Sequence, residues 1–214
     1  MKPLGRAKTR LRGTADEPAH VRLVLALTQD TVAAAIAAAV VRQVVVICSD
    51  EVVCAALAGD GVRSIPDEPG AGLNPALRYG EAVLRAADPT TIVGVLQGDL
   101  PALRPDELDC AIRTAVASGD RAFCADRTGT GTTLLLTPPG QLLRPCFGPG
   151  SAAAHRTTGA LELTGHWPGL RCDVDTAADL TIARGLGLGR FTSAALDATS
   201  EQPDHGQPRS RWNR

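Results

Sequence analysis

The stretch TIVGVLQGDLPAL, residues 91–103, places a carboxylate at the end of a buried strand. Its apolar, β-branched run stops at Gly98-Asp99, and Pro101 prevents the strand from continuing because proline cannot donate a ladder hydrogen bond. We therefore predict a strand over 91–96. In open α/β sheets, ligands bind beyond the carboxyl ends of the strands, so Asp99 is a candidate site residue. An aspartate in this position also commonly caps the following turn, and that alternative stays open.

Apolar runs alternate with alanine-rich helical patterns along most of the chain. Such an alternation is typical of a largely parallel sheet covered on both faces. The sequence therefore predicts an α/β fold with a mostly parallel sheet and helices on both faces. The predicted strands fall within 40–50, 62–65, 91–96, 121–125, 133–137 and 170–174, and the predicted helices within 51–58, 74–87 (N-cap Asn74), 105–118 and 176–185, with a further helix beginning near 151.

The composition limits the class of protein. With 214 residues, 44% of them apolar and 3% aromatic, the chain suits one domain of helices packed on a sheet. A formal net charge of −1 argues against nucleic acid or an anionic membrane as a partner. No apolar run approaches the ~20 residues of a membrane span, and six scattered cysteines without a CxxC pair indicate buried free thiols. We expect a cytoplasmic protein whose polar residues 191–214 form a disordered tail.

A second acidic cluster, CDVDT at 172–176, follows the last predicted strand. Strand alternation would place Asp173 and Asp175 on the same side. Three carboxylates gathered at one sheet edge would repel each other without a cation, and oxygen ligands of this kind favour Mg²⁺. In the alternative interpretation, Asp175 forms, together with Thr176, an N-cap with Asp179 in the first turn of the next helix.

Several segments are candidates for binding phosphate. The amino terminus MKPLGRAKTRLR is basic, although such stretches are usually solvated surfaces. GTGTT at 129–133 and FGPGS at 147–151 offer main-chain N–H groups and hydroxyls, the latter before a predicted helix. Neither matches GxGxxG or GxxxxGK[ST], which disfavours a dinucleotide dehydrogenase or a P-loop ATPase.

Six segments occur in order over nearly all of residues 2–185: KPLGRAKTRL, GLNPAL, LQGDLPAL, ADRTGTGT, FGPGSAAAHR and CDVDTAADL. Together they resemble the guanylyltransferases of deazaflavin coenzyme F-420 biosynthesis, most of all the actinobacterial branch. The combination is far more specific than any single motif. Members of this family are similar to the molybdenum cofactor guanylyltransferases and have a single nucleotidyltransferase domain of the GT-A-like, Rossmann-like type. The resemblance implies such a domain over 1–190.

The resemblance also implies a reaction, in which GMP passes from GTP to a phosphorylated three-carbon acid and pyrophosphate is released. The acid is phosphoenolpyruvate in the actinobacterial branch, giving enolpyruvoyl-2-diphospho-5'-guanosine, and 2-phospho-L-lactate in the archaeal branch. By motif position, the implied acceptor contacts are Thr132, Gly148 and Ser151, the Mg²⁺ ligands are Asp99, Asp173 and Asp175, the nucleotide contacts are Lys2, Lys8, Asn74 and Gly98, and the catalytic residues are Lys8 and Asp99.

No general base is needed, because the phosphate of the acceptor is the nucleophile and is already ionised at neutral pH. We therefore expect His155 and His166 to be structural. The rival functions are a 2-phospho-L-lactate guanylyltransferase, a molybdopterin or sugar-phosphate nucleotidyltransferase, and a non-catalytic nucleotide-binding α/β domain. The segment KPLGRAKTRL lacks the glycine-rich LAGG-type motif of the molybdopterin enzymes, whereas all three metal carboxylates are present. Homo-oligomerisation stays open.

The chain departs from the family pattern in two places. Cys146 stands where relatives often have an arginine before FGPxS, and Arg144 or Arg156 is the expected replacement. The family also has an apolar strand before the KPL segment, and this chain is written from Met1-Lys2. We expect on that basis that the natural start lies upstream and that the N-terminal strand is missing from the sequence.

Overall fold

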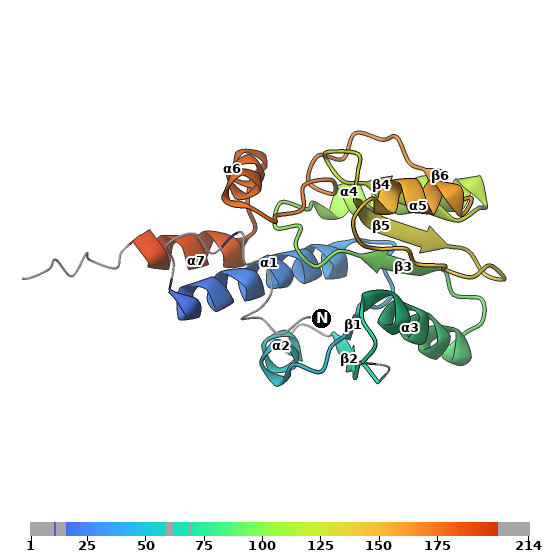
Figure 1. The fold of residues 1–214 in the computed structure, drawn as a ribbon, viewed down its shortest axis with the longest axis horizontal. Helices are drawn as coiled ribbons and strands as arrows, with labels where there is room; N and C mark the ends of the chain where they lie inside the picture. The colour runs from blue at the N-terminus through green and yellow to red at the C-terminus, as the bar shows by residue number, and fades with distance from the viewer. Residues whose placement is uncertain (1–10, 12–15, 59–61, 69, 201–214) are drawn as a thin grey trace, which may run out of the picture.

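The structure is a computed structural model that describes Leu11 and residues 16–58, 62–68 and 70–200. Helices and strands alternate along this part of the chain, and the strands gather beside the long first helix (Figure 1). In chain order the elements are α1 (Glu17–Ala37), β1 (Val45–Ile47), α2 (Glu51–Leu57), β2 (Arg63–Ile65), α3 (Leu73–Ala87), β3 (Val93–Leu96), α4 (Pro105–Ser118), β4 (Ala122–Ala125), β5 (Thr132–Thr137), α5 (Ser151–Thr157), β6 (Leu161–Glu162), α6 (Ala177–Leu186) and α7 (Arg190–Ser200).

The strands form a four-stranded sheet in the order β3-β5-β4-β6 and a separate parallel pair, β1-β2. β5 is antiparallel to both β3 and β4, whereas β4 and β6 are parallel. The α/β prediction is confirmed, but the larger sheet is mixed rather than mostly parallel. The reason lies in the connection, since only residues 126–131 separate β4 from β5. Parallel pairing needs a crossover of a dozen or more residues, whereas a short loop joins antiparallel strands.

Both faces of the larger sheet are covered by helices, as predicted. Along β4 and β5, Cys124 and Leu134 point into a core cluster with α4. Phe123 and Leu135 point the other way, into a cluster with α5 and α3. This alternation explains why the two strands are apolar at nearly every position, because each face of the sheet buries its own side chains.

α1 occupies the centre of the molecule and has no counterpart among the predicted elements. Asp16 caps its start by accepting a hydrogen bond from the main-chain N–H of Ala19 (2.7 Å). Buried side chains are spread along the helix on more than one face, so it lacks the one-sided apolar stripe that marks a surface helix. Among the described helices, none is long and apolar enough to cross a membrane.

The predicted disordered tail is wrong for residues 191–200, which form α7 alongside α1 (Figure 1). Asp30 of α1 is buried and accepts hydrogen bonds from the main-chain N–H groups of Phe191 (3.0 Å) and Thr192 (2.8 Å). Composition indicated a tail because the group that caps α7 comes from a distant part of the sequence. Residues 201–214 lie outside the described residues.

All six cysteines are free thiols. Cys48, Cys124 and Cys172 are buried, as predicted, and burial raises the pKa of each of these thiols. Cys110, by contrast, is exposed, so the prediction of burial is wrong there. The buried thiols pack as small apolar side chains.

Candidate active site

The carboxyl end of β3 is held from two sides. The N–H of Gln97 donates to the carbonyl oxygen of Thr133 on β5 (2.9 Å). The N–H of Leu100 donates to Oγ1 of Thr31 in α1 (2.8 Å). Asp99 lies between these anchors and is half-buried. Its main chain is therefore fixed by the sheet and by α1 together.

The predicted strand at 170–174 is absent, yet this segment does lie beside Asp99. The N–H of Val174 donates to the carbonyl oxygen of Asp99 (3.0 Å). The side chain of Val174 is fully buried in a cluster with α6, whereas Asp173 is half-buried and Asp175 is exposed. The segment makes isolated main-chain bonds instead of a strand ladder, and another of them runs from the N–H of Arg127 to the carbonyl oxygen of Arg171 (2.7 Å). The bond to Asp99 still brings the acidic residues of both segments into one neighbourhood.

Within the described residues, no three His, Cys, Asp or Glu side chains are arranged so that they could hold one metal ion. The predicted trio is therefore not a preformed three-ligand cage. Mg²⁺ does not need one, because it is usually held by one or two carboxylates and completed by substrate phosphates and water. The hard oxygen donors of Asp99 and its neighbours Asp173 and Asp175 fit that mode of binding.

Sequence reasoning missed Glu107, which positions the acidic segment. This residue of α4 is 8% exposed, and its carboxylate accepts hydrogen bonds from the main-chain N–H groups of Gly169 (3.1 Å) and Leu170 (3.0 Å). A Cβ at position 169 would overlap the carbonyl oxygen of Ala102, so only glycine fits there. Residues 169 and 170 lead directly into 172–176, and Glu107 therefore sets where the acidic cluster begins. Its place in the acidic first turn of a helix hid this role in the sequence.

Replacing Glu107 with Gln should raise the Mg²⁺ concentration needed for half-maximal activity by about tenfold. Gln puts an NH₂ group against one of the two buried N–H donors, and an unsatisfied buried donor costs about 1–3 kcal/mol. The segment that follows Leu170 is then displaced, and Asp173 is held in a poorer position to bind Mg²⁺. Magnesium titrations of the initial rate measure the effect.

The matched control is Asp106→Asn, one residue away in the same helical turn. Among the described residues, Asp106 pairs with Arg104 alone, on the surface (3.3 Å), and pairs of this kind contribute little to stability. An unchanged magnesium requirement in Glu107→Gln would contradict the positioning role.

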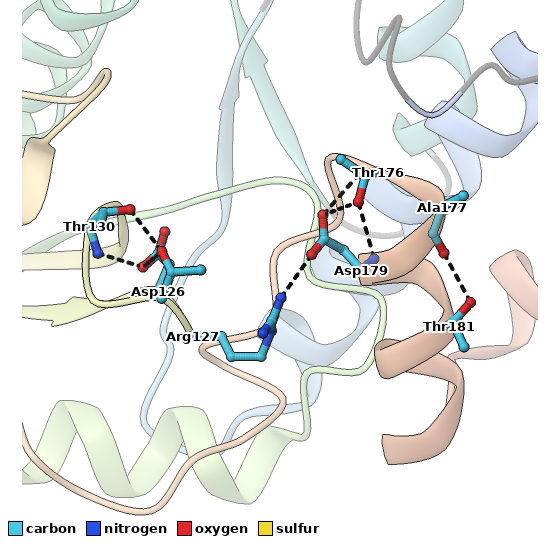
Figure 2. A network of polar contacts seen from close by, with 8 residues as sticks. Asp126, Arg127, Thr130, Thr176, Ala177, Asp179 and Thr181 are labelled. Carbon is cyan, nitrogen blue, oxygen red and sulfur yellow. Dashed lines mark hydrogen bonds and ion pairs between the residues drawn. The ribbon is translucent and has the colours of Figure 1, made fainter.

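The loop 126–131 lies beside the first turn of α6 (Figure 2). Asp126 shapes the loop, because its Oδ1 accepts hydrogen bonds from the N–H of Thr130 (2.9 Å) and the hydroxyl of Thr128 (3.0 Å). Arg127 donates to Asp179 (2.9 Å), and Asp179 closes a capping box with Thr176. Burial raises the pKa of Asp179, but the hydrogen bonds from Thr176 and Arg127 outweigh it and lower the pKa overall. The alternative interpretation as a helix cap is thus confirmed for Thr176 and Asp179, and the N-cap is Thr176.

The segments GTGT and FGPGS are brought together by a main-chain bond. The N–H of Ala152, in the first turn of α5, donates to the carbonyl oxygen of Thr130 (3.1 Å). Gly148 and Gly150 have φ angles of 136° and 72°, which L side chains adopt at a cost, and this explains both glycines of the motif. The predicted acceptor residues Thr132, Gly148 and Ser151 therefore belong to two adjoining segments, in which both hydroxyl-bearing residues are buried.

Asn74 does something other than the sequence suggested. The N-cap of α3 is Gly72, not Asn74. The Asn74 side chain instead donates to the carbonyl oxygen of Phe147 (3.0 Å) and accepts from its N–H (2.8 Å). An amide engaged in this way holds the FGPGS turn against α3. Its NH₂ group keeps a second N–H and its oxygen a second lone pair, so the assignment of Asn74 to the nucleotide stays a prediction.

Of the remaining predicted nucleotide contacts, the structure describes Gly98 but not the two lysines. Gly98 lies between β3 and α1, where a Cβ would make ordinary van der Waals contact with Thr28, so space alone does not require glycine. Lys2 and Lys8 lie outside the described residues. Their assignment to the triphosphate stays a prediction.

His155 is part of the buried core. Its ring is fully buried between Phe123 and Phe147, with centroid distances of 5.7 Å and 5.1 Å. Nε2 accepts a hydrogen bond from the N–H of Cys146 (2.9 Å), and Nδ1 lies 2.9 Å from Oγ1 of Thr132. Burial, assisted by the charge of Arg121, lowers the pKa of His155 to about 4.

Arg144 and Arg156, the two arginines expected to replace the family's arginine before FGPxS, have different surroundings in the structure. Arg156 is paired with Glu162 (2.7 Å). Arg144 has a φ angle of 47°, the left-handed region that non-glycine residues rarely adopt. Burial lowers the pKa of Arg121 and the charge of Arg144 lowers it further. Arg121 in turn donates to Thr158, at the end of α5 opposite Ser151.

Comparisons with known proteins show the family of the chain. The family model of the MobA-like NTP transferase domain matches residues 25–164. Curated phosphoenolpyruvate guanylyltransferases from Streptomyces scabiei and Geodermatophilus obscurus are each 50% identical over 200 residues, covering 91% of this chain and 92% and 90% of their own lengths. The chain belongs to the phosphoenolpyruvate guanylyltransferase family. It is accordingly a nucleotidyltransferase with a MobA-like NTP transferase domain.

Solved structures support the fold of this guanylyltransferase family member. A Desulfovibrio desulfuricans protein described as a nucleotide-diphospho-sugar transferase superposes with a TM-score of 0.66 at 17% identity, covering 92% of this chain and 90% of that one. A nucleotidyl transferase from Methanothermobacter gives a TM-score of 0.53 at 23% identity, over 75% and 80% of the two chains. At these identities the likeness concerns the fold alone, and it confirms a single nucleotidyltransferase-type α/β fold.

Proposed function

We propose that this chain transfers GMP from GTP to phosphoenolpyruvate, giving enolpyruvoyl-2-diphospho-5'-guanosine and pyrophosphate, as a step of coenzyme F-420 biosynthesis. The observation that carries the proposal is the 50% identity over nine-tenths of the chain to proteins named for this activity. Every motif assigned to the acceptor, the metal or the nucleotide is present. Activity in the cytoplasm is part of the same proposal.

In the proposed reaction, an oxygen of the acceptor phosphate attacks the α-phosphorus of GTP. The bond from that phosphorus to the bridging oxygen of the β-phosphate breaks, and pyrophosphate leaves with the electron pair. The nucleophile is ionised at neutral pH, so no side chain has to remove a proton from it. This agrees with His155, which contacts the proposed acceptor residue Thr132, being buried and uncharged at neutral pH.

The side chains of the site act by positioning and by charge. Asp99, Asp173 and Asp175 are proposed to hold Mg²⁺, which when bound would neutralise charge on the phosphates. Lys2, Lys8 and Gly98 are proposed to contact the nucleotide. Asn74 is also proposed to contact the nucleotide, and its side chain holds the FGPGS turn that carries the proposed acceptor residues Gly148 and Ser151.

The decisive experiment pairs each nucleoside triphosphate with each acid and identifies the product by mass. We expect a product only with Mg²⁺, GTP and phosphoenolpyruvate, together with an equal amount of pyrophosphate. A product with 2-phospho-L-lactate alone would reassign the acceptor, and a product with a sugar phosphate or a molybdopterin would reject the proposal. Binding of nucleotide without any product would favour a non-catalytic domain.

Ser151→Ala should raise the KM for phosphoenolpyruvate by roughly ten- to hundredfold and leave the KM for GTP nearly unchanged. A hydrogen bond to a charged group contributes about 1.5–3 kcal/mol, which corresponds to that range. Steady-state kinetics with each substrate varied in turn measure the effect. Thr157→Ala is the control, because Thr157 is an exposed residue of the same helix whose hydroxyl donates to the carbonyl oxygen of Ala153 in that helix. Equal losses for both substrates would contradict the assignment of Ser151 to the acceptor.

A further inference from the structure

A β-bulge turns the side chain of Thr132 toward α5. Cys124 pairs with Leu134 and Ala125 pairs with Thr132, so Thr133 is an extra residue opposite β4. Strict alternation would put Thr132 on the α4 side together with Leu134. The bulge moves it to the opposite face, which carries α5. Bulges are common next to active sites, where they redirect a side chain.

On that face Thr132 meets His155, and the tautomer of the ring follows from its other partner. A main-chain N–H can only donate, so the N–H of Cys146 requires an unprotonated Nε2 on His155 (2.9 Å). The neutral ring then carries its hydrogen on Nδ1. That hydrogen points at Oγ1 of Thr132, 2.9 Å away, and Thr132 accepts it.

The hydroxyl of Thr132 therefore acts as an acceptor toward His155 and keeps its own proton for another group. No other hydrogen bond of this hydroxyl is present among the described residues. The side chain is 4% exposed and the ring of His155 is fully buried, so neither can easily rotate into another arrangement. The proton of a hydroxyl held in this way stays available for a further partner, and an anionic oxygen makes the stronger hydrogen bond with it.

We infer that His155 is a positioning residue for the acceptor: its Nδ1–H fixes Thr132 so that the Thr132 hydroxyl donates to an anionic oxygen of the phosphorylated acid. This inference rests on the proposed function for the identity of the acid. The acid is the relevant partner because Thr132 directly follows the loop that the N–H of Ala152 joins to the FGPGS turn (3.1 Å from the carbonyl oxygen of Thr130). His155 acts through Thr132 and does not itself touch substrate.

Two substitutions separate the two hydrogen bonds of the ring. In His155→Gln, the side-chain oxygen can replace Nε2 as the acceptor for Cys146, but nothing donates to Thr132. In His155→Asn, the amide N–H can replace Nδ1–H as the donor to Thr132, but Cys146 loses its acceptor. The first substitution tests positioning and the second serves as its matched control.

For His155→Gln we expect the KM for phosphoenolpyruvate to rise about three- to tenfold, the range of one neutral hydrogen bond, with the KM for GTP unchanged. Thr132→Val should raise the KM for the acid at least as much, and adding His155→Gln to it should have no further effect on that KM. His155→Asn should lower the melting temperature but keep the KM for the acid near that of the unmodified chain. Equal rises in both KM values, or additive effects in the double variant, would overturn the inference.

A measurement that needs no activity decides the same point. Nitrogen NMR of the unmodified chain with labelled histidine should show His155 with a protonated Nδ1 and an unprotonated Nε2 at pH 7, and Thr132→Val should shift the Nδ1 signal. A ring protonated on Nε2 would overturn the inference even if guanylyl transfer is observed. Failure to make product from GTP and phosphoenolpyruvate would instead contradict the proposed function, and the tautomer would still be tested.

Discussion

Asp99→Asn is expected to lower kcat by about 10²- to 10³-fold, the loss typical of removing one electrostatic contact to a transition state. Asn has nearly the same shape but no charge, so it should bind Mg²⁺ poorly. The fold should survive, because the main chain around Asp99 is held by Thr31 on one side and by Val174 on the other. Turnover at saturating GTP and acid, measured over a range of Mg²⁺ concentrations, gives the effect.

Circular dichroism and melting temperature separate lost chemistry from lost structure in this variant. Asp106→Asn serves as the charge-matched control, since it removes the same charge from a surface position. Near-normal, magnesium-dependent turnover in Asp99→Asn would show that Asp99 is a turn-capping residue and that the metal site lies elsewhere.

Stability toward acid is the second large effect, and it should depend on His155. Burial lowers the pKa of this ring to about 4 in the folded chain, against about 6.5 when unfolded. The unfolded state therefore takes up the proton first. The contribution of the neutral His155 ring to the free energy of unfolding is fully present above about pH 6.5. It is lost as the pH decreases toward 4, by up to about 3 kcal/mol. Denaturant melts at several pH values between 7 and 4 measure the loss.

The groups in contact with the His155 ring do not themselves change charge between pH 7 and 4. The ring faces Phe123 and Phe147, which do not titrate, and the nearby charge of Arg121 keeps its sign throughout this range. His155→Gln removes the titrating group, so its stability should fall less between pH 6.5 and 4 than that of the unmodified chain. Protonation of paired carboxylates such as Asp179 also destabilises the folded chain in acid, but this loss is the same in both proteins. Parallel pH profiles for the two proteins would contradict a buried, neutral His155.

Where local signals were strong, the sequence predicted the elements well. The structure begins and ends α4 at the predicted Pro105 and Ser118, because a proline in the first turn and a glycine after the last turn mark both ends in the sequence. The strand at Val93–Leu96 was equally clear from its apolar run and the proline that follows. The segment 170–174 looked like a strand by composition, but it makes isolated main-chain bonds, one of them to Asp99, instead of a ladder.

The prediction for Asn74 shows why local patterns fail at the site. Asn before Pro is a typical helix start, and nothing near it in the sequence reveals that its amide is engaged by Phe147, 73 positions later. Glu107 was likewise hidden in an ordinary acidic first turn, although its partners are 62 and 63 positions away. In both cases the partner that gives the side chain its role is brought close only by folding.

The sequence by itself therefore determined the α/β class, most of the helices and strands, the family and the segments that carry the chemistry, because periodicity, turn residues and motifs are all local properties of the chain. Only the tertiary structure decided the antiparallel placement of β5, the docking of α7 on Asp30, and the pairing of Thr132 with His155. Each of these depends on contacts between residues far apart in sequence. Such contacts form when burial of the two-faced sheet and satisfaction of buried polar groups select one arrangement of the whole chain.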